Sequence, residues 1–242
     1  MEREVKKIVF LCSGNGGNLI FIHKAIQLSW LEAEIISVIT DRLCLANEFA
    51  SNMNIDNKVI DFRENGQIQL YAILNKYDPD VIVTTVHKII STKIIGKYGE
   101  KLINLHYSLL PSFGALIGEL PVKKALSYGV KIAGVTTHYI SEHVDMGRPI
   151  TQIAIPLKSD EPDFTLLMSI FFKCGCVALL GAIFRVLNVS RPYEQVAILN
   201  IKNYTCLSNG TKKPEIYLND DVWSYIKNQI SFLKSNSHKF DK

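Results

Sequence analysis

The chain has 242 residues, of which 48% are hydrophobic, and a formal net charge of +4. A chain of this length and composition can bury a full core, and we expect one domain, residues 1–190, followed by an extension, residues 191–242. The mild charge and the lack of a Lys/Arg block interleaved with aromatic residues argue against a nucleic-acid partner.

Near-continuous apolar segments alternate with helical segments in the first part of the chain. The predicted strands are Lys7–Ser13, Glu34–Thr40, Lys58–Phe62, Val81–Val86 and Leu102–Leu105, and helices begin near Asn18, Leu43, Gln67 and Ser91. Strands of this kind, separated by helices, are typical of a parallel sheet covered on both faces. The predicted fold class is therefore α/β, with a doubly wound, mostly parallel sheet.

The pattern changes after Pro111. We expect a helix at Glu119–Tyr128 and two strands, Ile132–Ile140 and Ile150–Leu157, that extend the sheet or pair antiparallel at its edge. The apolar segment Phe164–Leu187 is long enough to cross a membrane, but it contains Lys173 and Arg185. It is therefore predicted to be a helix packed on the sheet, and no membrane partner is expected.

The extension is predicted to form a hairpin and an amphipathic helix. Its strands are Val196–Ile201 and Glu215–Leu218, with a turn at Ser208-Asn209-Gly210-Thr211. The helix Asp220–Leu233 carries one apolar face, formed by Trp223, Ile226, Ile230 and Leu233. That face either covers a sheet edge of its own chain or pairs with a second subunit in a homodimer.

The cysteines and the first residues bear on the compartment. The five cysteines, Cys12, Cys44, Cys174, Cys176 and Cys206, are scattered and odd in number, which argues against a disulfide framework. The chain runs directly into an apolar strand without the pattern of a secretory signal. A reducing, cytoplasmic location follows, and Cys174-Gly175-Cys176 is expected to hold buried thiols rather than a metal because no second ligand pair follows at zinc spacing.

The most informative polar residues lie at the end of the strand that begins at Leu102. Asn104 and His106 alternate, so both side chains point to one side of that strand, and Asp145 lies in a later loop. Each residue alone is as well explained by a turn, but two polar side chains on one inward face need partners. Together, an amide, an imidazole and a carboxylate can polarise a carbonyl and move a proton, which is the chemistry of acyl transfer to an amine.

Two further segments are candidates for ligand binding. Ser13, Gly14, Asn15, Gly16, Gly17 and Asn18 precede a helix, where backbone N–H groups can face a phosphate, although a plain strand-to-helix turn is the alternative. The segment is neither a P-loop nor a dinucleotide fingerprint. His87, Lys88, Ile89 and Ile90 either line a pocket for a flat heterocycle with carboxylates or only begin a helix. His138 is either a supporting histidine or a core histidine.

The order and spacing of these motifs resemble those of the folate-dependent formyltransferases, and within them the glycinamide ribonucleotide formyltransferases. The resemblance covers about residues 7–187 and leaves out the extension. It rests on residues 13–19, 88–91, 102–106 and 108–111, and on the stretch from Gly134 through His138 to Ile150.

The resemblance implies a role for each candidate residue. Asn104, His106 and Asp145 would be catalytic, and residues 13–18 would hold the substrate phosphate. His87–Ile90, with Val144 and Asp145, would bind the pterin of 10-formyltetrahydrofolate. The implied reaction is formyl transfer from this co-substrate to a primary amine of a phosphate-bearing small molecule, by default glycinamide ribonucleotide of purine biosynthesis.

Three departures from the family pattern bear on the acceptor. Tyr107 replaces a proline, Gly114-Ala115-Leu116-Ile117 replaces a Lys-Gly-x-His stretch, and Phe172 aligns with a glutamate that grips the substrate amine. An aromatic ring cannot make the same charged hydrogen bond, which favours a different amine. One alternative is therefore an N-formyltransferase of a nucleotide-linked amino sugar. Another is a catalytically silent module that binds a folate or a nucleotide, against which the intact Asn104, His106 and Asp145 argue.

Overall fold

A computed structural model describes residues 5–157, 163–188, 196–202, 204–209 and 219–236. The chain divides into two compact units, Met1–Leu102 with Asp220–Lys242, and Ile103–Asn219. The predicted extension, residues 191–242, is therefore divided between the two units. The helix Asp220–Asn236 belongs to the first unit, and the strands Val196–Ile201 and Tyr204–Asn209 belong to the second.

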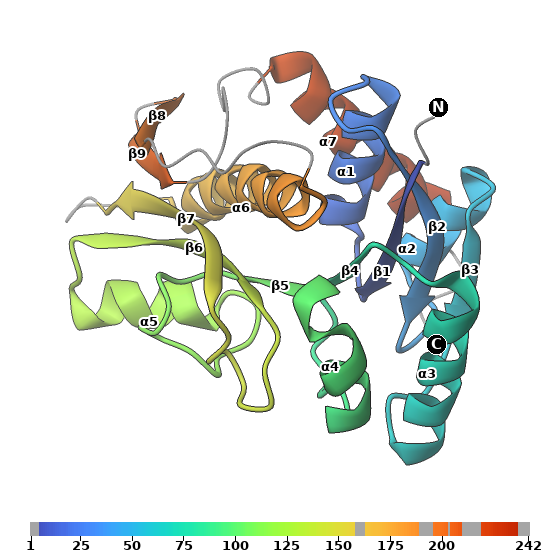
Figure 1. Cartoon of the computed structure of the whole chain (residues 1–242). Helices are drawn as coiled ribbons and strands as arrows, with labels where there is room; N and C mark the ends of the chain where they lie inside the picture. The colour runs from blue at the N-terminus through green and yellow to red at the C-terminus, as the bar shows by residue number, and fades with distance from the viewer. Residues whose placement is uncertain (1–4, 158–162, 189–195, 203, 210–218, 237–242) are drawn as a thin grey trace. The chain divides into compact units, whose positions relative to one another are not determined.

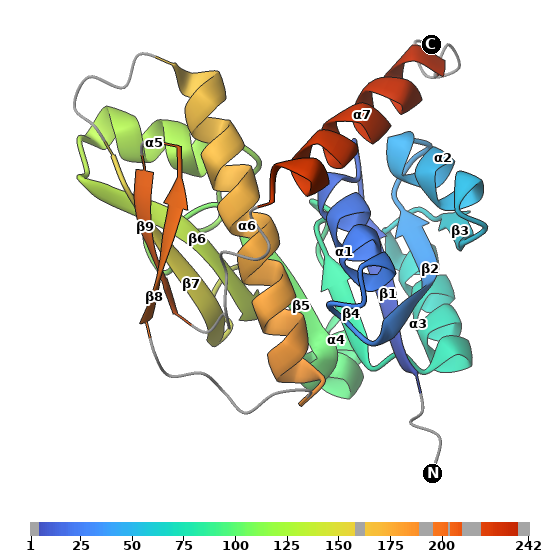
Figure 2. The same cartoon turned by 90° about the horizontal axis from the view of Figure 1, so that it is seen from above.

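In unit 1, parallel strands follow the order β3-β2-β1-β4. The strands are β1 (Lys6–Cys12), β2 (Ala33–Thr40), β3 (Asp56–Val59) and β4 (Val81–Thr84), and the helices are α1 (Gly17–Gln27), α2 (Leu45–Asn52), α3 (Glu64–Tyr77), α4 (Thr92–Tyr98), the short η1 (Gly99–Lys101) and α7 (Asp220–Asn236). Helices α1 and α2 pack on one face of the strands and α7 packs on these two helices, whereas α3 and α4 lie on the other face (Figures 1 and 2). Because both faces are covered, strand residues such as Phe10, Val38 and Ile82 are fully buried.

Helix α7 buries Trp223, Ile226 and Leu233 of the apolar face that the sequence predicted, whereas Ile230 is only half-buried. The rings of Phe21 on α1 and Trp223 on α7 stack with centroids 5.3 Å apart, and Val222, Ile226 and Leu233 are buried. The helix packs on α1 and α2. The face is therefore covered by helices of its own unit rather than by a sheet edge.

In unit 2, antiparallel strands follow the order β5-β6-β7-β9-β8. The strands are β5 (Leu102–His106), β6 (Ile132–Tyr139), β7 (Pro149–Pro156), β8 (Val196–Ile201) and β9 (Tyr204–Asn209), and the helices are α5 (Leu120–Tyr128) and α6 (Phe164–Val186). Helix α6 packs on β6 and β7, and α5 lies on the other side of these strands (Figure 1).

Helix α6 is long and apolar enough to cross a membrane by length and composition alone, but 72% of its most apolar stretch is buried within the fold. Leu167, Phe171 and Val177 are fully buried. Its packing on β6 and β7 agrees with the sequence prediction of a helix that covers a sheet.

The turn predicted at Ser208-Asn209-Gly210-Thr211 is wrong for its first two residues, and Gly210 and Thr211 lie outside the described residues. Ser208 and Asn209 belong to β9, which pairs with β8 from Ile201 opposite Tyr204 to Val196 opposite Asn209. Alternating burial continues along β9 through Ser208, so the strand extends past the point where the local turn signal begins. The hairpin turns instead at Lys202, whose φ of 52° is in the left-handed region that tight hairpin turns use. The predicted strand Glu215–Leu218 lies outside the described residues.

Strand β3 also differs from its prediction, since it spans Asp56–Val59 rather than Lys58–Phe62. The Ile60 N–H still donates to the Thr40 carbonyl of β2 at 2.9 Å, but residues 60–62 lie outside the assigned strand and lead to α3, which begins at Glu64. The apolar side chains of Ile60 and Phe62 are buried, which explains why their pattern predicts a strand.

Candidate active site

The pairing of β5 with β6 brings Asn104 opposite His138. The Asn104 Nδ2 atom lies 3.2 Å from His138 Nε2, and His138 Nδ1 lies 2.8 Å from the carbonyl oxygen of Tyr139. Because a carbonyl only accepts, Nδ1 carries the proton, and Nε2 accepts from the Asn104 amide. Burial lowers the pKa of His138, which agrees with a neutral ring.

Asp145 lies beside His106. The distance from His106 Nδ1 to Asp145 Oδ2 is 3.3 Å, and His106 Nε2 lies 3.1 Å from the carbonyl oxygen of Phe113. Both neighbours are acceptors, so only the imidazolium form of His106 can donate from both ring nitrogens. The second oxygen of Asp145 lies 3.6 Å from His138 Nε2. Asn104, His106, His138 and Asp145 therefore form one cluster.

This cluster is largely shielded from solvent and held by strained loops. His106 is 6% exposed, and the Asp145 side chain is 11% exposed. Asp145 Oδ2 also accepts a hydrogen bond of 2.8 Å from the backbone N–H of Ala115. Phe113, Ala115 and Asp145 have φ values of 55°, 59° and 55°, a conformation that costs a non-glycine residue about 1–2 kcal/mol. The bond between Ala115 and Asp145 links the two strained loops.

Buried polar contacts also fix the segment that follows β5. The Thr136 hydroxyl donates to the Ser108 carbonyl at 2.7 Å and accepts from the Leu110 N–H at 3.0 Å. The Gln152 amide donates to the same hydroxyl at 3.0 Å. These contacts anchor the segment that leads to the Phe113 carbonyl. Sequence reasoning missed Thr136 and Gln152, although Thr136 alternates with His138 along β6 and so shares its side of the strand.

Tyr107, which departs from the family pattern, is accommodated by a glycine on α6. A Cβ atom at Gly175 would lie 2.9 Å from Tyr107 Cε1 and 3.1 Å from Leu105 Cδ2. The missing side chain at Gly175 therefore leaves room for the tyrosine ring against α6. Phe172 is half-buried on the same helix.

The loop formed by residues 13–18 belongs to unit 1 and connects β1 to α1. Gly14 and Gly16 have φ values of 76° and 67°, which glycine adopts without strain. Gly16 is the N-cap of α1, and the first turn contains no acidic residue. The positive end of the α1 dipole is therefore not balanced by a carboxylate in its own first turn, as suits a bound anion.

Unit 1 also contains a pocket of about 780 Å³ near the ends of β2, β3 and β4. It is lined by Asp41, Val59, Ile60, Asp61, Phe62, Arg63, His87, Lys88 and Ile89. The Gln67 side chain ties its walls together, because its Nε2 donates to the carbonyls of Phe62 and Ile89 at 2.8 and 2.9 Å. Burial and the nearby Arg42 lower the pKa of His87.

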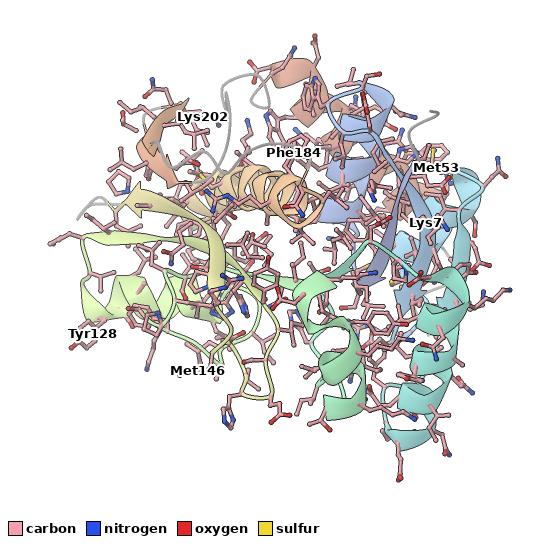
Figure 3. All side chains as sticks on the ribbon, in the orientation of Figure 1. Lys7, Met53, Tyr128, Met146, Phe184 and Lys202 are labelled. Atoms are coloured by element: carbon pink, nitrogen blue, oxygen red, sulfur yellow. The ribbon has the colours of Figure 1, made fainter. Side chains whose placement is uncertain are left out.

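The residues predicted to bind the pterin are divided between the units. His87, Lys88 and Ile89 line this pocket, whereas Ile90 is buried beside them. Val144 belongs to unit 2, where it is exposed, as is the neighbouring Met146, which projects outward in Figure 3. Sequence reasoning missed Asp41, although a carboxylate directly after the second strand of a βαβ unit is a recognisable signal.

Comparison with known families and relatives gives matches over most of the chain. Residues 6–171 match the family described as formyl transferase. The chain is 29% identical over 172 residues to the human trifunctional purine biosynthetic protein adenosine-3, covering 68% of this chain but 17% of that protein. It is 26% identical over 166 residues to the phosphoribosylglycinamide formyltransferase of Mycobacterium tuberculosis, covering 66% of this chain and 75% of that one. Identity to the formyltetrahydrofolate deformylase of Bacillus subtilis is 33% over 165 residues, covering 63% and 51%.

Solved structures match as well. Phosphoribosylglycinamide formyltransferase from Bacillus halodurans has a TM-score of 0.70 at 24% identity, covering 78% of this chain and all of that one. The enzyme of that name from Anaplasma phagocytophilum has a TM-score of 0.68 at 26% identity, covering 81% of this chain and 92% of its own.

Proposed function

The chain belongs to the formyl transferase family, and we propose that it transfers a formyl group from 10-formyltetrahydrofolate to a primary amine of a phosphate-bearing small molecule. The matches confirm the predicted family and the α/β fold class. The formyl donor of this family is 10-formyltetrahydrofolate. Glycinamide ribonucleotide is the default acceptor, because relatives and structural neighbours are named phosphoribosylglycinamide formyltransferase.

The observation that carries the proposal is the placement of His106 between the Asp145 carboxylate and the Phe113 carbonyl. In the transfer, the amine nitrogen attacks the formyl carbon, the carbonyl oxygen becomes an oxyanion, and the bond to the folate nitrogen then breaks. We assign oxyanion stabilisation to Asn104 and protonated His106. Asp145 orients His106, stabilises its charge and relays the amine proton through water to the departing tetrahydrofolate nitrogen. His138 fixes the orientation of the Asn104 amide.

Binding roles follow from the features of unit 1. The uncapped helix end at Gly16 supports a phosphate role for residues 13–18. The pocket lined by His87, Lys88 and Ile89 supports a folate role for residues 87–90. All five cysteines are buried, and a cytoplasmic enzyme stays part of the proposal because their scattered positions and odd number argue against a disulfide framework.

Release of tetrahydrofolate from 10-formyltetrahydrofolate is the experiment that tests this reaction. We expect release that depends on an added amine and a formylated amine in equal amount. Release without an amine would instead indicate hydrolysis, the second candidate, which the 33% identity to a deformylase favours. If no tetrahydrofolate is released with any amine or without one, the result would favour the catalytically silent module that binds a folate or a nucleotide.

The same assay identifies the acceptor. Phe172 stands at the position expected for an amine-binding carboxylate, and a lost charged hydrogen bond costs about 1.5–3 kcal/mol, or roughly tenfold or more in recognition. We expect the wild type to use glycinamide ribonucleotide poorly compared with a dedicated purine enzyme, and Phe172→Glu not to lower that residual activity. Efficient formylation of glycinamide ribonucleotide by the wild type would show this expectation wrong and assign the protein to purine synthesis. Preferential use of a nucleotide-linked amino sugar would establish the alternative.

A further inference from the structure

The hairpin formed by β8 and β9 lies at one end of the strand order, beyond β7 (Figure 1). Its pairing with β7 is short, because only Leu207–Asn209 of β9 are in register with Gln152–Ala154 of β7. The outer edge of β8 pairs with no strand in the part of the chain that the structure describes. A hairpin with one short pairing and one free edge opens locally at a lower free energy than the whole fold does.

Two thiols meet where this hairpin packs on α6. The Cys174 Sγ atom of α6 lies 3.9 Å from the Cys206 Sγ atom of β9, and both residues are fully buried. Along β9, Tyr204, Cys206 and Ser208 are the buried residues, and Leu207 between them is exposed. Because side chains alternate along a strand, Cys206 faces the helix rather than solvent.

Cys176 is a second, fully buried cysteine of α6, but it lies on another side of the helix. Residues two positions apart are separated by about 200° around a helix axis. Cys174 is therefore the cysteine of α6 that faces β9. The remaining two cysteines, Cys12 and Cys44, belong to unit 1.

The contact makes the two thiols unequal. The hydrogen bond from the Cys174 S–H lowers the pKa of Cys206, whereas the same contact and burial raise the pKa of Cys174. The thiolate is the form that attacks an oxidant, so Cys206 reacts first when the hairpin opens. Cys174 is then the neighbouring thiol that reacts with the oxidised sulfur.

We propose that Cys174 and Cys206 are a redox-responsive pair that a peroxide converts into a disulfide, which ties the β8–β9 hairpin to α6. The Cys206 sulfur attacks one peroxide oxygen and the O–O bond breaks, so that Cys206 becomes a sulfenic acid and its lost proton leaves with the second oxygen as water. The Cys174 sulfur then attacks the Cys206 sulfur and the S–O bond breaks. The departing hydroxide takes the Cys174 proton and leaves as a second water. The peroxide is reduced, and both sulfurs are oxidised.

Closure of this pair is a small movement. The sulfur atoms must come about 2 Å closer, because a disulfide bond is about 2.0 Å long. Rotation about the Cα–Cβ bonds moves both sulfurs, and the weakly paired hairpin can follow them. The bond then holds β9 on the buried helix and prevents the local opening of the edge. Exchange with small-molecule thiols reverses it, as expected of a transient disulfide in a reducing compartment.

Treatment of the reduced, full chain with hydrogen peroxide tests the proposal. The treated protein is unfolded and alkylated, and peptide mass spectrometry then maps every cysteine. We expect a cross-link between Cys174 and Cys206 that dithiothreitol reverses, with Cys12, Cys44 and Cys176 alkylated. In the oxidised, folded protein we expect the backbone amides of β8 and β9 to exchange hydrogen at least about tenfold more slowly, because the opening that exposes them is blocked.

Cys174→Ala and Cys206→Ala should each abolish the cross-link and the slower exchange. Cys176→Ala is the matched control, because it removes another buried thiol of the same helix and should keep both effects. The mapping and the exchange on wild-type protein stand even where a variant fails to fold. Thiols that stay reduced, oxidation without a cross-link, a cross-link through Cys176, or a cross-link with unchanged exchange would overturn the proposal.

Discussion

Asp145→Asn tests the contact at the centre of the proposed active site. Asp145 Oδ2 lies 3.3 Å from His106 Nδ1 and accepts from the Ala115 N–H at 2.8 Å. An asparagine keeps an oxygen for the Ala115 bond, so the loop should hold, but it removes the negative charge that faces the imidazolium. A hydrogen bond to a charged group contributes about 1.5–3 kcal/mol, and this side chain is largely desolvated. Taking about 3 kcal/mol, with about 1.4 kcal/mol per tenfold, we expect kcat to fall by roughly 100-fold.

The assay follows tetrahydrofolate release with the amine that the wild type formylates best, and thermal unfolding confirms that the variant is folded. Glu142→Gln is the control, because Glu142 is exposed in the loop that carries Asp145 and its substitution removes the same charge. A folded Asp145→Asn protein with kcat within threefold of wild type would refute the assigned role of this carboxylate.

Three further predictions concern packing, pH and the loop of unit 1. Gly175→Ala should lower the free energy of unfolding in urea by about 1–3 kcal/mol, because its Cβ would lie 2.9 Å from Tyr107 Cε1. Adding Tyr107→Ala should restore part of this loss, and a single variant as stable as the wild type would contradict the prediction. Burial lowers the pKa of His138 below its ordinary 6.5, so the unfolded chain binds a proton at this residue at a higher pH than the folded chain does. The free energy of unfolding should therefore fall as the pH drops below about 6.5. His138→Gln should reduce this pH dependence, and an unchanged dependence would contradict the assignment to His138. Gly16→Val should raise the KM for the acceptor more than the KM for folate, because the φ of Gly16 is 67° and an added Cβ would lie 3.1 Å from Ala46 Cβ. Equal rises in the two KM values would mean that the loop only shapes the fold.

The sequence by itself determined most of the secondary structure and the neighbourhood of Asn104 and His106. Apolar strands separated by helices predict a covered parallel sheet because burial on both faces requires such strands, and unit 1 has that arrangement. Alternation along β5 places Asn104 and His106 on one side of the strand because successive side chains point to opposite faces.

The tertiary structure alone decided which distant groups meet. Three contacts join segments that are apart in the sequence: the Phe113 carbonyl with His106, the Ala115 N–H with Asp145, and the Gln67 amide with the carbonyls of Phe62 and Ile89. Each contact uses a backbone atom, which leaves no local pattern in the sequence. The same holds for Asp41 Oδ1, which has no hydrogen-bond partner in the part of the chain that the structure describes and is buried by residues far along the chain. Local propensity acts over a few residues, whereas burial and hydrogen-bond partners are set by contacts between segments that only folding brings together.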